Sequence, residues 1–292
     1  MTRYLTIFLV LYSRSFVLAQ TSAFSFKNIN INEGLSQSSV VDIAVDQTGF
    51  LWFATQDGLN RFDGKDFLVF NKIFDDVTVP SGNRLGKIIT GNNNDLWLIT
   101  SGGRLERLNL YDHSFESLNK ITKDSIPLPP ASCLYLNKKK QLWIGTESDG
   151  LYVYTPSDKH LTRYTAGKNS LLQLNDNHIH SIFADKNNHY WILTKNGITV
   201  VNPELKEAKQ LLKQSLPSTP STISCSAIDE DEDGVLWLGS FGKGLFIKRK
   251  TDTTFIPFTG FSSQTIPSDL VVYSIKADKN GNIWIGTYSN GL

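Results

Sequence analysis

The sequence predicts an all-β protein, a β-propeller built from four-stranded antiparallel blades. Three observations support this: the six tryptophans recur every 45 to 48 residues, four short strand-like runs accompany each of them, and turn residues separate the runs. Self-similarity at this period is typical of propeller blades. The tryptophans are Trp52, Trp97, Trp143, Trp191, Trp237 and Trp284. We therefore expect about six blades centred on these residues, with the last one truncated.

The first repeat shows how each blade is expected to be built. Its four runs are VVDIAVD (40–46), FLWFAT (50–55), LNRFD (59–63) and DFLVF (66–70). Each run alternates apolar and polar residues or is rich in β-branched and aromatic residues, and Gly, Asn or Asp stands between the runs. These runs are predicted to be strands that follow one another from the inside of the ring outward.

Residues at fixed offsets from the tryptophan indicate a repeated scaffold. Three positions before it stands Gly or Asn in five copies, as a hairpin turn with positive φ favours, and Lys140 in the third copy. Three positions after it, a hydroxyl in every copy predicts one repeated hydrogen bond that joins strands or neighbouring blades. These residues are Thr55, Thr100, Thr146, Thr194, Ser240 and Thr287. Because the tryptophans occur equally in every copy, we interpret them as packing between blades rather than as an aromatic ligand platform.

Residues 1–19 are predicted to be a secretory signal peptide. Arg3 precedes an apolar run over residues 4–12, and the segment ends in Val17-Leu18-Ala19, with small side chains where a signal peptidase cleaves. The alternative, a membrane anchor, needs about 20 apolar residues, so this run is too short. We expect residues 20–292 to form one β-propeller domain in the periplasm.

Composition disfavours a nucleic-acid partner. The 29 basic and 28 acidic residues give a net charge of +1, and they are spread along the chain without a basic stripe. Cys133 and Cys225 lie on strand-like runs two repeats apart. A disulfide needs Cα atoms within about 7 Å, a distance that adjacent blades can provide but blades two apart should not. We expect both to be buried free thiols.

The consensus D-x-x-G-x-L-W-I-G-T-x-x-G-L resembles the repeat of the two-component regulator propellers. The segment 26–64, with its lead-in EGLSQSSV, looks like the first repeat of that family, whereas Ile99 and Leu193 replace the usual small residue in copies two and four. The resemblance implies the periplasmic sensor region of a hybrid histidine kinase that is tethered to the membrane and dimeric. It also implies further propeller and kinase segments that are missing from this chain, which we interpret as a piece of a longer sensor. SFKNIN (25–30) is expected to be an outer strand that closes the ring on the last blade.

Two motifs raise the possibility of metal chemistry. DEDEDG (229–234) alternates carboxylates as calcium loops do, but the twelfth position is Ser240 instead of a carboxylate, so we interpret it as a solvated turn. His178 and His180 form an H-x-H pair with no evident third ligand. The sequence contains no catalytic motif that we recognise. We therefore expect neither a metal, a cofactor nor an enzyme activity in this segment.

Variable positions beside the repeated ones are the predicted ligand-binding residues. If strands run outward in chain order, the turn after the second strand and the connection into each first strand share one face of the ring. A position fixed in structure but free in chemistry is where a repeat scaffold builds a specific site. The predicted binding residues are Gln56, Arg84, Glu147, His178, Lys195, Phe241 and Tyr288. Planar polar groups beside aromatic rings would suit an oligosaccharide.

Three functional hypotheses follow. The first is a non-enzymatic propeller that senses an oligosaccharide and signals to a histidine kinase encoded outside these residues. The second is a metal-dependent propeller enzyme of the streptogramin-lyase or lactonase type, to which the H-x-H pair and DEDEDG would contribute. The third is a protein-interaction scaffold of the cell envelope.

Overall fold

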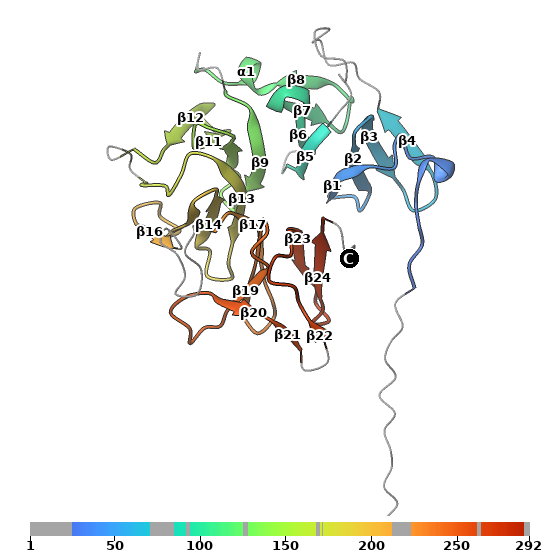
Figure 1. The fold of residues 1–292 in the computed structure, drawn as a ribbon. Coiled ribbons are helices and arrows are strands. Elements are labelled where there is room, and N and C mark those ends of the chain that lie inside the picture. Colours follow the sequence, from blue (N-terminus) through green and yellow to red (C-terminus); the bar gives the residue numbers. More distant parts are fainter. Residues whose placement is uncertain are drawn as a thin grey trace, which may run out of the picture.

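The computed structural model describes residues 25–70, 85–91, 94–124, 128–167, 170, 172–211, 223–261 and 264–288. Within them the chain forms six antiparallel sheets arranged around a central axis, which confirms the predicted β-propeller (Figure 1). The first strand of each sheet is the innermost, and consecutive inner strands are neighbours around the axis. Helical residues are confined to three short segments, η1 (Ile31–Glu33), η2 (Ser101–Gly103) and α1 (Leu118–Ile121).

Five of the sheets have four strands that pair in chain order. Blade one contains β1 (Val40–Val45), β2 (Leu51–Thr55), β3 (Gly58–Phe62) and β4 (Phe67–Phe70). Blade two contains β5 (Leu85–Thr90), β6 (Asp95–Thr100), β7 (Leu105–Asn109) and β8 (Phe115–Ser117). Blade three contains β9 (Ala131–Leu136), β10 (Leu142–Thr146), β11 (Leu151–Thr155) and β12 (His160–Tyr164). Blade four contains β13 (Ile179–Ala184), β14 (Tyr190–Thr194), β15 (Gly197–Val201) and β16 (Ala208–Leu211).

Blades five and six complete the described structure. Blade five contains β17 (Cys225–Glu230), β18 (Leu236–Ser240), β19 (Leu245–Lys248) and β20 (Ile256–Phe258). A small hairpin of β21 (Gly260–Phe261) and β22 (Gln264–Thr265) leads to blade six. The described part of blade six is the pair β23 (Val272–Ala277) and β24 (Ile283–Thr287).

The four strands predicted for the first repeat are confirmed, because the ends of β1 to β4 agree with the predicted ends within one or two residues.

The prediction of an outer strand over residues 25–30 is wrong for this structure. These residues form no strand, and the segment leads into η1, which Asn30 caps. A fourth strand would need a third strand to pair with, and the described part of blade six has only two. The segment nevertheless lies beside blade six, because the ring of Phe26 meets Trp284 edge-on at a centroid distance of 6.3 Å.

An aspartate holds the tryptophan in four of the blades. It lies six positions earlier, in the turn between the first two strands, and one of its carboxylate oxygens accepts the indole N–H. The pairs are Trp52 with Asp46 at 2.7 Å, Trp191 with Asp185 at 3.0 Å, Trp237 with Asp231 at 2.8 Å and Trp284 with Asp278 at 2.9 Å. The other oxygen accepts backbone N–H groups of the same turn. Hydrogen bonds from Asn282 and Trp284 lower the pKa of Asp278 to about 2.

The turn and the hydroxyl behave alike across the repeats. All six turn residues three positions before the tryptophan have φ between 54° and 91°, including Lys140 at 63°, where the left-handed conformation costs about 1–2 kcal/mol. In four blades the hydroxyl donates to the carbonyl of the next repeated glycine. These bonds run from Thr55 to Gly58 at 2.9 Å, Thr146 to Gly150 at 2.7 Å, Thr194 to Gly197 at 2.8 Å and Ser240 to Gly244 at 2.8 Å. The bond closes the turn between the second and third strands of one blade.

The tryptophans of blades one to five pack against the following blade. Trp52, for example, lies in one cluster with Leu85 and Ile88 of β5, and Trp143 packs against Tyr190 of β14 at a centroid distance of 4.3 Å and an interplanar angle of 37°. The remaining three occupy equivalent clusters with residues of the next blade. Both cysteines are buried and unbridged, as predicted.

A second contact between blades follows a rule of complementary size. The residue two positions after the tryptophan meets the first residue of the next inner strand, and one of the two is always small. The pairs are Ala54 with Leu85, Ile99 with Ala131, Gly145 with Ile179, Leu193 with Cys225 and Gly239 with Val272. A Cβ built on Gly239 would lie 2.5 Å from Cγ1 of Val272. Ile99 and Leu193 replace the small residue that stands at this position in the other repeats. Each of them faces a small residue of the next blade, Ala131 or Cys225.

This rule predicts a favourable coupling between Gly239 and Val272. Gly239→Ala alone should cost about 1–3 kcal/mol by overpacking, and Val272→Ala about 2 kcal/mol by leaving a cavity. Together they should cost about 1 kcal/mol less than their sum, because Val272→Ala removes the closest contact of the new methyl group, that with Cγ1, and leaves only the contact with Cβ at 2.8 Å. Urea unfolding of the four proteins measures the coupling. As a control, Gly239→Ala combined with Leu59→Ala in blade one should be additive, and additivity in the first pair would contradict the rule.

Candidate ligand site at the mouth of the central channel

The inner strands line a cavity of about 860 Å³ on the propeller axis. Residues of β1, β5, β9, β13, β17 and β23 form its wall, and Gln56 and Phe241 lie at its edge in the turns that follow β2 and β18. The cavity is therefore a shared product of all six blades.

Hydrogen bonds tie these turns to the segments that enter the inner strands. In five blades the residue after the repeated hydroxyl donates its backbone N–H to a carbonyl in the segment that enters an inner strand. The residue that carries this carbonyl directly precedes the first residue of the strand. The pairs are Gln56 to Ser39, Glu147 to Pro130, Lys195 to His178, Phe241 to Ser224 and Tyr288 to Val271, at 3.0–3.3 Å. The prediction that these turns and connections share one face is confirmed. We call this face the channel mouth.

Every inner strand has a bulge near the channel mouth. The pairing with the second strand shifts register directly after the first residue of β1, β5, β9, β13, β17 and β23. A bulge re-aims a side chain and is common at barrel rims and beside binding sites. The residues skipped in this way include Val41, His180, Ser226 and Tyr273, and all four line the cavity.

Five rings form a continuous series along the mouth over blades four to six, which we call the aromatic arc. The centroid distances are 4.6 Å from His178 to His180, 5.1 Å from His180 to Phe241, 5.9 Å from Phe241 to Tyr273 and 5.9 Å from Tyr273 to Tyr288. Phe241, Tyr273 and Tyr288 are 38%, 53% and 72% exposed. Large exposed rings that touch one another make an apolar surface at the opening.

The histidine of the arc next to the cavity is uncharged at neutral pH. Burial, and secondarily the proximity of His178, lower the pKa of His180 to about 4. Its Nε2 lies 3.3 Å from the hydroxyl of Ser224 on the next blade. On the opposite wall, Lys87 and Asp42 form an ion pair at 3.5 Å, and Asp42 also accepts the backbone N–H of Ile88.

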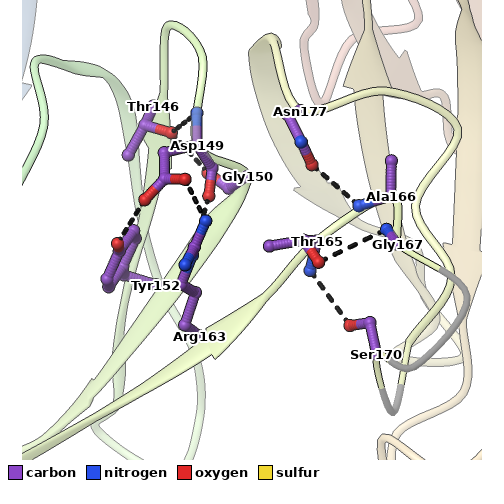
Figure 2. A network of polar contacts seen from close by, with 10 residues as sticks. All are labelled: Thr146, Asp149, Gly150, Tyr152, Arg163, Thr165, Ala166, Gly167, Ser170 and Asn177. Carbon is purple, nitrogen blue, oxygen red and sulfur yellow. Dashed lines mark hydrogen bonds and ion pairs between the residues drawn. The ribbon is translucent and has the colours of Figure 1, made fainter.

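A polar network fixes the connection between blades three and four, as Figure 2 shows. Asp149 accepts the hydroxyl of Tyr152 at 2.5 Å and forms an ion pair with Arg163. The backbone N–H of Gly150 donates to the carbonyl of Asn177 at 2.9 Å, and the side chain of Asn177 accepts from the N–H of Ala166 at 2.7 Å. The segment that carries His178 is thus held in place on the mouth before any ligand arrives.

Three of the five carboxylates of DEDEDG have structural partners. Asp229 accepts from Lys276 at 2.8 Å, Glu230 accepts the backbone N–H of Lys186 at 2.7 Å, and Asp231 accepts the indole of Trp237. Among the residues that the structure describes, no group of three or more His, Cys, Asp or Glu side chains is placed to hold a metal ion.

The structure places the predicted binding residues at different parts of the mouth. His178, Phe241 and Tyr288 belong to the aromatic arc, and Gln56 lies across the cavity on blade one. Glu147 and Lys195 are exposed on the turns of blades three and four, while Arg84 lies outside the described residues.

Sequence reasoning missed Tyr273 and Ser226 as site residues, and it considered His180 only as a metal ligand. All three are bulge residues. The available signal was the second position of each inner strand, which varies in chemistry between repeats while the residue before it stays apolar.

Comparison with known proteins gives the following similarities. Residues 34–57, 173–196 and 265–289 match the profile of the family described as two component regulator propeller. The second match covers the fourth repeat, despite its unusual Leu193. Histidine kinase P4 of Formosa agariphila is 50% identical over 60 residues, which are 20% of this chain and 4% of that protein.

Solved structures share the fold. The extracellular domain of BT3049 from B. thetaiotaomicron, described as a hybrid two component system, is 23% identical with a TM-score of 0.51, over 91% of this chain and 41% of that one. PorZ, a surface component of the type-IX secretion system of Porphyromonas gingivalis, is 16% identical with a TM-score of 0.63, over 84% and 37%. Virginiamycin B lyase from Staphylococcus aureus is 15% identical with a TM-score of 0.58, over 84% and 76%. The chain thus spans less than half the length of the BT3049 domain and of Histidine kinase P4. Within its described residues we find no helix long and apolar enough to cross a membrane.

The two interpretations of DEDEDG make opposite predictions for Asp231 and Asp233. Asp231→Ala should lower the free energy of unfolding by about 2–3 kcal/mol, because the indole and a turn N–H lose a charged acceptor. The matched variant Asp233→Ala, at an exposed position, should change it by less than about 0.5 kcal/mol. Chemical unfolding with and without Ca²⁺ measures both. Stabilisation by Ca²⁺ that either variant abolishes would show that the motif is a calcium loop.

The low pKa of His180 predicts an acid-sensitive fold. As the pH falls from about 6.5 to about 4, the unfolded chain binds a proton at this histidine before the folded protein does. Stability is therefore lost over this window, by on the order of 1 kcal/mol from this group. His180→Gln should reduce the pH dependence measured by urea unfolding. An unchanged slope in His180→Gln would contradict the assignment.

Proposed function

We propose that this chain senses an oligosaccharide outside the cytoplasm. Three of its repeats match the profile of the two component regulator propeller family, to which the chain belongs. Ligand binding would occur at the channel mouth. The signal would pass to a histidine kinase, as in the longer proteins that the chain resembles. The proposal includes export by residues 1–19 and action as a homodimer through other parts of the receptor.

The observation that supports this function is the division between constant and variable positions. The turn residue, the tryptophan and the hydroxyl repeat from blade to blade and are engaged in holding the blades together. Around the mouth, the residues in the turns after the second strands differ in every blade, the bulge residues vary between blades, and both sets include exposed rings. A surface that is rigid in its backbone and free in its side chains is suited to selecting one ligand.

Signalling requires that the ligand prefer one arrangement of the receptor. Binding at the mouth touches residues from several blades, so a ligand can favour one packing of the ring or of a receptor dimer over another. A ligand with such a preference increases the fraction of receptors in the favoured arrangement. The difference between its affinities for the two arrangements sets the upper limit of this increase.

The rival enzyme hypothesis has less support. The lyase that shares the fold is similar at only 15% identity, a level that reports architecture and not chemistry. The H-x-H pair does not present two free imidazoles to a metal, because the two rings contact each other and Nε2 of His180 faces Ser224. The similarity to PorZ supports a scaffold function equally weakly.

Thermal unfolding separates the hypotheses. An oligosaccharide at about 100 times its Kd should raise the Tm by about 5–10 °C, because ligand binding adds about 2.7 kcal/mol to the stability of the folded state. After treatment with EDTA, addition of Ca²⁺, Mg²⁺ or Zn²⁺ should leave the Tm unchanged. A rise with a divalent metal, without a response to any oligosaccharide, would favour the enzyme and contradict the sensor.

A further inference from the structure

We propose that the aromatic arc and the buried hydroxyl of Ser226 form a subsite for an uncharged sugar ring at the channel mouth. The inference rests on the proposed function and narrows its ligand to neutral oligosaccharides, as distinct from uronic or sulfated ones. Three independent features of the mouth support it.

The first feature is the exposed aromatic surface. Phe241 and Tyr273 meet at an interplanar angle of 75°, and Tyr273 and Tyr288 meet at 62°, so neighbouring rings face in different directions around one opening. Edge-to-face packing leaves ring faces free for a ligand while the rings support one another. The axial C–H groups of a pyranose form an apolar patch of about the size of such a face. Binding sites of this kind combine aromatic walls with a few polar groups.

The second feature is an unsatisfied hydroxyl. Ser226 is 8% exposed and lines the cavity, and its Oγ has no hydrogen-bond partner among the described residues. Buried polar groups in native proteins nearly always have partners, so this hydroxyl calls for an explanation, and a ligand that occupies the same cavity would provide one. The bulge in β17 turns this residue out of the regular pairing, in the same way that it presents Tyr273 in β23. The Oγ atom itself is shielded from solvent, so a sugar hydroxyl in the cavity would reach it, and supply the missing partner, after a small shift of the neighbouring side chains.

The third feature is the absence of free charge on the cavity wall. The charged residues among its described lining are Asp42 and Lys87, which form an ion pair with each other. The other polar lining residues are uncharged: Gln56, Ser181, Ser226, Tyr273 and Ser274, together with His180. Among the described residues this wall offers no unpaired cation to an anionic sugar and no unpaired carboxylate to a quaternary ammonium ion. The exposed Lys195 lies outside the wall, on the turn of blade four beside the arc. Hydroxyl, amide and imidazole groups pair with the hydroxyls of a neutral sugar without a desolvated charge.

Isothermal titration of the full-length protein tests the subsite. The probes are neutral tetrasaccharides of glucose, mannose and xylose, a tetragalacturonate, a sulfated galactan tetrasaccharide, and betaine. We expect a neutral probe to bind at least tenfold more tightly than either acidic probe and than betaine. Tyr273→Ala and Phe241→Ala should each weaken that binding at least tenfold. Tyr111→Ala is the matched control, because Tyr111 is 88% exposed in the turn between β7 and β8 and should not affect binding.

Ser226→Ala distinguishes a binding role from a structural one. Removing an unpaired buried hydroxyl should raise the Tm of the ligand-free protein by about 2 °C and weaken binding of the neutral probe about tenfold. A residue that served only the fold would change stability and leave affinity unchanged, and that result would contradict the proposed role of Ser226.

The remaining outcomes separate the subsite from the function on which it rests. Preference for an acidic probe or for betaine would overturn the neutral-sugar inference. Tight binding of a neutral probe that is unaffected by Tyr273→Ala and Phe241→Ala would overturn the location but preserve the oligosaccharide sensor. If no oligosaccharide bound, both the subsite and the proposed function would be wrong.

Discussion

Much of this structure depends on how one indole in each blade is held on both sides. In four blades an aspartate in the turn between the first two strands accepts the indole N–H, and in blades one to five the ring packs on the following blade. The same carboxylate accepts turn N–H groups, so a single side chain fixes the turn and the orientation of the ring. Contacts within a blade and contacts between blades are therefore coupled. This coupling lets short strands form a ring with a continuous core.

The two blades that lack this aspartate show how much variation the contact tolerates. In blade two Gly91 takes its place, and a Cβ at that position would lie 1.7 Å from Oδ1 of Asp95, which fills the space instead. In blade three Asn137 keeps the turn hydrogen bond to Gln141, but Nε1 of Trp143 has no partner among the described residues. Packing against Tyr190 keeps the Trp143 ring buried without that hydrogen bond. Packing is thus the shared element, and the carboxylate reinforces it.

The sequence allowed the strands, the positive-φ turns and the shared face of the site to be predicted, because these depend on residues close together in the chain. The bulges were not predictable, since a register shift is a property of two paired strands and not of a residue pattern in one. Tyr273 and Ser226 were missed for this reason. The size rule between blades was equally hidden, because Ile99 looks like a defect until Ala131 is known to face it. The outer strand expected at residues 25–30 failed because a strand needs a partner that the pattern alone does not reveal.

The residues that hold the blades together and the residues that line the candidate site lie on opposite faces of the ring. One face of the ring carries the turns in which aspartate and indole meet, and the other carries the variable turns, the bulges and the aromatic arc. This separation allows ligand specificity to change without weakening the fold, provided that the bulge positions are free of structural duties. Ser224 and His180 are an exception to this separation, because their contact lies at the channel mouth and also joins blades four and five.

The most direct test of this account is a crystal structure of the protein with a bound neutral oligosaccharide. The account predicts a sugar ring against Tyr273 and Phe241, with one of its hydroxyls within hydrogen-bond distance of Oγ of Ser226. A sugar bound to the opposite face, beside the turns that hold the indoles, would contradict it.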